Sequence, residues 1–138
     1  MGRFQILSIA AVLACANSAQ AADSALILGK SSYSANCAIC HGDNGTGDGP
    51  VAELFQVAPA DLTGLSERNG GAFPFSEVYQ TIASGVGEKA HGASAMPIWG
   101  SYFIADTLTD RGMNKADAEH IVQGRILSLA YYLESIQK

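Results

Sequence analysis

Two cysteines and a histidine lie within one short segment, Cys37-Ala38-Ile39-Cys40-His41. On a helical turn, side chains three residues apart point the same way, so both sulfurs can reach one side of a flat ligand. The adjacent histidine can then place its imidazole beneath the centre of that ligand. This C-x-x-C-H spacing is typical of covalent haem attachment through two thioether bonds. Covalent attachment also suits a small domain, which cannot easily hold a large apolar group by packing alone.

Other interpretations of the cysteine pair need partners that the sequence does not offer. A zinc site needs two more ligands at short spacing, but the other histidines, His91 and His120, lie far apart. A thioredoxin-like redox pair expects a strand–helix–strand context, and no strand alternation is present. An iron–sulfur cluster normally takes four cysteines. A simple disulfide of an exported protein is the alternative that stays open.

The first 22 residues have the features of a secretory signal peptide. Arg3 provides a basic start, residues 4–14 form an almost unbroken apolar run, and Ala19-Gln20-Ala21 fits a signal-peptidase site. The run is shorter than the roughly 20 apolar residues that a membrane span needs. We therefore expect export to the periplasm, with lipid anchoring through Cys15 as the alternative.

Removal of residues 1–22 leaves one domain over residues 23–138, with no membrane span. It takes away one of the 8 basic residues and none of the 13 acidic residues, which leaves a formal net charge of −6. Nucleic acid is excluded as a partner, because binding it depends on neutralising phosphates with Lys and Arg. An acidic surface instead favours rapid, salt-sensitive encounters with basic patches on other proteins.

Hydrophobic periodicity predicts helices joined by loops rich in glycine and proline. The expected helices cover residues 24 to about 37, a short stretch over 51–55, Ser76 to about 84, and a last helix that begins near Asn114 and runs to the C-terminus. The segments 42–50, 60–74 and 85–100 are expected to be loops. The last helix carries an apolar stripe that should pack on the first helix; it comprises Val122, Ile126, Leu129, Leu133 and Ile136.

A haem iron bound by His41 needs a sixth ligand or an open site, and this choice decides the function. Met96 is the favoured candidate, because it lies in an expected loop and Pro97 stiffens the chain directly behind it. His91 is the rival in the same loop. Met113, near the start of the last helix, has a weaker claim, and His120 is expected to face solvent.

Residues 37–62, together with Met96-Pro97-Ile98-Trp99-Gly100, resemble the class I cytochrome c family of bacteria. The spacing of Gly29, Tyr33 and Cys37 is similar to the family's small-residue and aromatic pair before the first haem cysteine. Leu129 and Tyr132 match the leucine and aromatic pair of its last helix. The resemblance implies an all-α fold in which the N- and C-terminal helices cross tightly and loops wrap around one covalently bound haem c.

The same resemblance implies roles for single residues around the haem. Pro50 matches the family proline whose backbone carbonyl accepts the ring N–H of His41, a bond that fixes the ring. Trp99 resembles a tryptophan that packs against the haem edge. Arg125 could reach a haem propionate, but a solvated helix face is the expectation. The segment 101–113 is longer than a minimal cytochrome needs, and it is expected to be a docking element or a surface loop.

The function implied by the resemblance is one-electron transfer by a carrier with His41 and Met96 as axial ligands, and no catalytic residue is predicted. Redox partner proteins are expected to dock transiently at the exposed haem edge near Cys37 and Cys40. One alternative is a haem-bearing redox subunit of a dehydrogenase or oxidase complex. The other is a sensor or enzyme in which the sixth position opens to a small ligand.

Overall fold

The computed structural model describes residues 23–85, 96–111 and 113–138, which are helical and contain no strand. The expected signal peptide with Cys15, and the rival ligand His91, lie outside these residues. The helices are one over residues 23–36, α2 (Ala38–His41), η1 (Ala52–Leu54, a 3-10 turn), α3 (Leu65–Arg68), α4 (Phe75–Ser84), α5 (Trp99–Arg111) and α6 (Lys115–Ser135). Within the described part of the chain, no helix is long and apolar enough to cross a membrane. The all-α prediction is confirmed.

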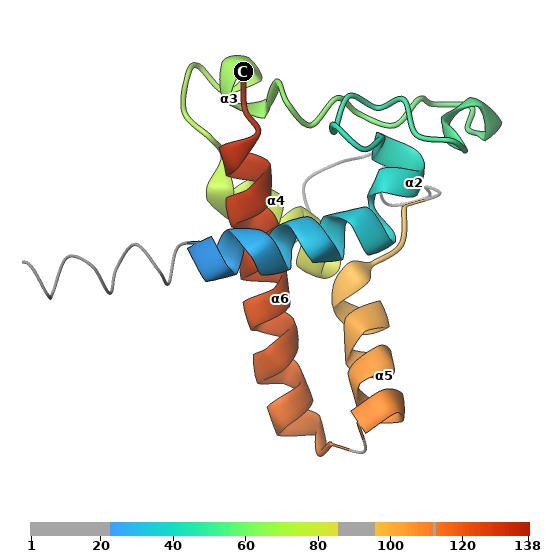
Figure 1. Cartoon of the computed structure of the whole chain (residues 1–138), viewed down its shortest axis with the longest axis vertical. Helices are drawn as coiled ribbons and strands as arrows, with labels where there is room; N and C mark the ends of the chain where they lie inside the picture. Colours follow the sequence, from blue (N-terminus) through green and yellow to red (C-terminus); the bar gives the residue numbers. More distant parts are fainter. Residues whose placement is uncertain (1–22, 86–95, 112) are drawn as a thin grey trace, which may run out of the picture.

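The helix over residues 23–36 crosses α6 near the middle of the molecule (Figure 1). Gly29 allows this crossing, because a Cβ atom there would overlap the carbonyl oxygen of Ser128 and lie 2.8 Å from Cβ of Tyr132. One turn further along, the ring of Tyr33 packs on that of Tyr132 with centroids 5.2 Å apart. The two terminal helices therefore meet backbone to backbone, as the resemblance implied.

Helix α6 forms the centre of the core. It begins as predicted: Asn114 is its N-cap, and the Asn114 side chain accepts a hydrogen bond of 3.0 Å from the backbone N–H of Asp117. Four residues of the predicted stripe are buried, and Ile136 packs partly buried against them. The core is completed by Tyr33 and by side chains from α4 and α5; the latter are Val78, Ile82 and Phe103.

Helix α4 begins one residue before the predicted cap at Ser76. Its N-cap is Pro74, without a side-chain hydrogen bond, and Phe75 is its first residue. The first turn of α4 also packs on α6, since the ring centroid of Phe75 lies 5.0 Å from that of Tyr131. The segment 60–74 was expected to be loop throughout, and it contains the single turn α3.

The prediction of a surface loop over residues 101–113 is wrong. Helix α5 occupies most of this segment and runs beside α6 as a helical hairpin (Figure 1). Phe103 is fully buried between the helices. The hydroxyl of Thr107, also buried, donates to the carbonyl oxygen of Phe103 at 2.7 Å, which satisfies a polar group inside the hairpin.

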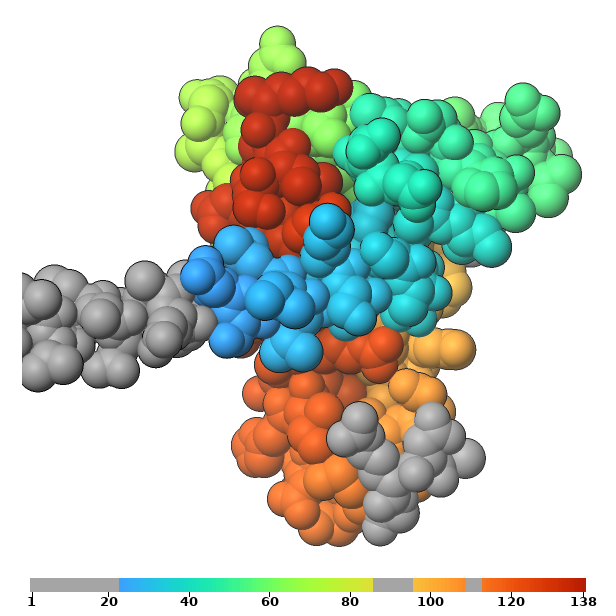
Figure 2. All heavy atoms as spheres, viewed as in Figure 1, coloured from blue at the N-terminus to red at the C-terminus, as the bar shows by residue number. Residues whose placement is uncertain are grey.

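A lobe formed by residues 42–62 projects beside the helical body (Figure 2). Its glycine-rich beginning folds back on α2: the N–H of Gly47 donates to the carbonyl oxygen of His41 at 2.8 Å, and that of Gly49 to Cys40 at 3.1 Å. Gly47 has φ of 84°, where a side chain would be strained, and a Cβ atom there would overlap the carbonyl oxygen of Pro59. The lobe is thereby held close to the end of α2.

Candidate haem site

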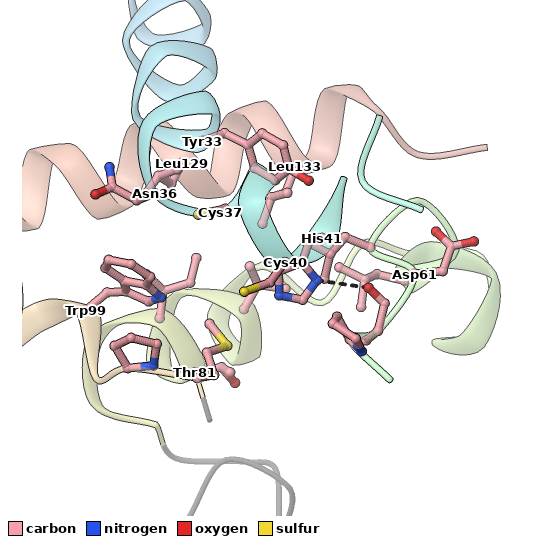
Figure 3. Close-up of a pocket in the computed structure, with 18 of the residues that line it drawn as sticks. Tyr33, Asn36, Cys37, Cys40, His41, Asp61, Thr81, Trp99, Leu129 and Leu133 are labelled. Atoms are coloured by element: carbon pink, nitrogen blue, oxygen red, sulfur yellow. Dashed lines mark hydrogen bonds between the residues drawn. The ribbon is translucent and has the colours of Figure 1, made fainter. Parts of the chain in front are cut away.

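A pocket of about 850 Å³ opens between the lobe and the helical body (Figure 3). Its size falls in the range of small-molecule and cofactor sites. Residues from separate parts of the chain form its walls: the end of the first helix, α2, residues 54–62, α4, residues 96–99 and α6. Most of the wall is apolar; Leu54, Phe55, Val78, Ile82, Leu129 and Leu133 all line it.

Cys37 and Cys40 both line this pocket as partly buried free thiols. Cys37 is the N-cap of α2, and its carbonyl oxygen accepts from the N–H of His41 at 2.9 Å, so one helical turn holds both sulfurs and the imidazole. Burial and, to a smaller extent, the nearby Cys40 raise the pKa of Cys37 to about 12, against an opposing effect of Arg125.

His41 is almost fully buried, and its ring has a defined orientation. Nδ1 lies 3.0 Å from the carbonyl oxygen of Ala60 (dashed line in Figure 3). A carbonyl can only accept, so Nδ1 carries the proton and donates it. Nε2 then keeps the lone pair that a metal requires. The hydrogen bond fixes the ring and increases its basicity as a ligand.

The carbonyl that accepts from His41 was predicted to be that of Pro50, and the structure corrects this assignment. Pro50 is exposed and does not line the pocket. Because the N–H of Gly49 is bonded to Cys40, and that of Val51 to Ile39 at 3.2 Å, Pro50 is held beside α2 away from the imidazole. The chain approaches the His41 ring at Ala60, ten residues after Pro50. The sequence has a second proline after His41, Pro59, which directly precedes Ala60. Spacing alone does not show which of the two prolines lies near the imidazole.

Met96, Pro97 and Trp99 contribute to the same pocket from a segment 55 residues after His41. The structure therefore brings together the predicted imidazole and thioether ligands. The ring of Trp99 lines the pocket and also packs on Phe103 of α5, with centroids 5.5 Å apart. Met113 does not line the pocket, and His120 is exposed on α6, as predicted.

The donor set fits an iron porphyrin. Two cysteine sulfurs, an oriented imidazole and a thioether share one largely apolar pocket, and His41 and Met96 are the residues that could bind the iron. Among the residues that the structure describes, no group of three or more His, Cys, Asp or Glu side chains could hold a metal ion.

A family model described as Cytochrome c matches residues 26–123, well over half of the chain. The chain belongs to the cytochrome c family. Membership implies covalent haem binding and electron transfer. No curated protein and no solved structure matches the chain. The matched range includes the C-x-x-C-H segment, Met96 and Trp99 of this cytochrome c domain.

Arg125 occupies neither of the positions considered for it in this cytochrome c domain. It does not line the pocket, and its side chain is only 28% exposed. Its guanidinium instead contacts two other helices, and no pattern along the chain indicates these contacts. Arg68 does line the pocket; its guanidinium donates to the carbonyl oxygen of Asp61 at 2.5 Å.

Proposed function

We propose that this chain is an exported one-electron carrier whose single haem has His41 and Met96 as axial ligands. The observation that supports the proposal most is that Cys37, Cys40, His41 and Met96 line one apolar pocket. Two protein ligands of this kind would leave no open position on the iron for a substrate. No acid–base pair suited to peroxide chemistry was found in the sequence, which favours a carrier over an enzyme.

Each residue has a distinct part in this mechanism. Cys37 and Cys40 bind the porphyrin covalently, and the bond from His41 to Ala60 orients the imidazole. When bound, haem supplies an iron that takes up and releases one electron. A thioether from Met96 favours a higher reduction potential than a second histidine would. The apolar wall excludes water, which limits the rearrangement that accompanies the change in charge.

Partner proteins would meet this carrier at the mouth of the pocket. Ile39, between the two cysteines, is 55% exposed, and Leu54 and Val57 of the lobe are more exposed still. A small apolar contact surrounded by an acidic surface suits brief encounters with basic partners. The signal-like residues 1–22 support a periplasmic location. We expect electron transfer with such partners to slow as ionic strength rises.

Substitution of Met96 by alanine tests the ligand assignment. We expect Met96→Ala to keep its covalent haem, to bind carbon monoxide when reduced, and to have a lower reduction potential, because the sixth position opens. Absorption spectra and potentiometry measure all three effects. Met113→Ala is the matched control, since Met113 lies outside the pocket. An unchanged six-coordinate spectrum and potential in Met96→Ala would show that another residue is the ligand.

A further inference from the structure

Arg125 of α6 connects three helices through one guanidinium group. Nη1 forms an ion pair of 3.2 Å with Oδ2 of Asp106 on α5, and Nε donates to Oγ of Ser32 on the first helix at 3.3 Å. Cζ lies 3.8 Å from the centroid of the Phe103 ring, which is fully buried. An exposed ion pair is commonly worth little, but this one is partly buried and combined with a cation–π contact.

The contacts of Arg125 lead to both sides of the haem pocket. Phe103 packs on Trp99, which lines the pocket three residues after Met96. Ser32 lies five residues before Cys37, on the helix that continues into the C-x-x-C-H turn. Arg125 thus joins the segment that carries His41 to the helix that follows Met96.

Helix α5 is held by different contacts along its length, and the guanidinium adds to the core packing of its middle. Gly100 packs against α4, because a Cβ atom there would overlap the carbonyl oxygen of Ala83, so the first turn of α5 has its own anchor. One turn later Phe103, and one further turn on Asp106, contact Arg125 instead. Rotation or displacement of α5 about its first turn is therefore opposed by the guanidinium. Such a movement would shift Met96, three residues before the helix.

We propose that Arg125 is a positioning residue, which holds α5 against the first helix and so keeps Met96 in place opposite His41. The inference rests on the proposed function, in which Met96 is the sixth ligand. It assigns Arg125 no contact with the haem. Loss of the guanidinium contacts should increase the fraction of molecules in which the sulfur leaves the iron.

The test uses the exported, haem-loaded protein and three variants. Arg125→Leu removes the charge and the donors, Arg125→Lys keeps the charge but not the planar fork, and Asp106→Asn removes only the acidic partner. Lys115→Leu is the control, because it removes a cation of the same helix whose pair with Glu119 is exposed and lies within α6. Each protein is examined for the far-red sulfur–iron band when oxidised, for carbon monoxide binding when reduced, and for unfolding by denaturant.

We expect Arg125→Leu to retain covalent haem, to weaken the sulfur–iron band and to increase the fraction that reacts with carbon monoxide by about tenfold. Arg125→Lys and Asp106→Asn should give smaller changes in the same direction. Lys115→Leu should resemble the parent. If Arg125→Leu does not fold, the milder variants decide by the same readouts.

Two results would overturn the inference, and they differ from each other. A parent protein with the band, together with Arg125 and Asp106 variants that react with carbon monoxide no more than Lys115→Leu, would contradict the positioning role alone. The positioning role would be contradicted even if the Arg125 and Asp106 variants unfold more easily than the parent. Their lower stability would then show a structural role only. A parent without the band would contradict the Met96 assignment itself, and the role of Arg125 would fall with it.

Discussion

The hydroxyl of Tyr33 holds the glycine-rich loop to the first helix. It donates a buried hydrogen bond of 2.6 Å to the carbonyl oxygen of Gly42, and burial raises the pKa of Tyr33, so the donor proton is retained. We expect Tyr33→Phe to lower the free energy of unfolding by ~1 kcal/mol, because the carbonyl loses this partner. Denaturant titration measures the change. Tyr102→Phe, at a half-exposed ring, is the control; equal stability of both variants would contradict the assignment.

Asp61 stabilises the segment that carries the acceptor for His41. Hydrogen bonds from the hydroxyl and N–H of Thr63, at 2.6 and 2.8 Å, lower the pKa of Asp61, and Lys138 and Arg68 lower it further. A carboxyl whose pKa is lower in the folded protein stabilises it above the unfolded pKa and loses this effect as pH falls through the folded pKa.

We therefore expect Asp61→Asn to be less stable than the parent at neutral pH, with a difference that shrinks below about pH 4. Denaturant titrations at a series of pH values measure it. Thr63→Val removes the largest cause of the shift and should change the pH dependence in the same direction. A difference between parent and Asp61→Asn that does not vary with pH would contradict this account.

Single residues of the site were predictable where the chemistry depends on spacing along the chain. The C-x-x-C-H turn places Cys37, Cys40 and His41 together by local geometry alone. Ala60 was missed because its role depends on where a loop returns in space. The returning segment is held by a hydrogen bond of 2.7 Å from the N–H of Leu62 to the carbonyl oxygen of Gly45, and Ala60 rather than Pro50 lies at the imidazole.

At the scale of elements, the helix crossing depends on one missing side chain. Gly29→Ala would place a methyl group against the backbone of Ser128, so the helices must separate. We expect it to lower the free energy of unfolding by about 1–3 kcal/mol. Gly124→Ala in α6 is the matched control, since its added methyl meets nothing within 4 Å. That variant should be unchanged or more stable by up to ~1 kcal/mol, because alanine favours helix; equal effects at both positions would contradict the crossing.

Helices α6 and α5 show why some elements are easier to predict than others. Helix α6 has a capping residue, Asn114, and a buried stripe at helical spacing, and both were recognised. The buried residues of α5 include Gly100, Phe103 and Thr107, of which only one is large and apolar. Trp99 and Ile104 pack on the core only partly buried, and Asp106 faces Arg125 through a polar contact. No apolar stripe marks such a helix, so its packing partner must be known before the helix can be recognised.

At the scale of the whole molecule, the pocket is a product of chain topology. Its walls come from segments near the beginning, middle and end of the domain, and the lobe over residues 42–62 closes one side. The sequence indicated the ligands and the fold family, but not the walls. Residues as far apart in the chain as Leu54 and Leu133 line one pocket only because of the path of the connecting loops.

The most direct test of the account is an absorption spectrum of the exported protein, oxidised and reduced, with carbon monoxide added to the reduced form. A carrier with His41 and Met96 as axial ligands should show a low-spin c-type spectrum, a weak far-red sulfur–iron band when oxidised and no response to carbon monoxide. These features would show that Met96 and His41 occupy both axial positions of one haem. A shift on addition of carbon monoxide, or a protein without covalent haem, would contradict the central claim.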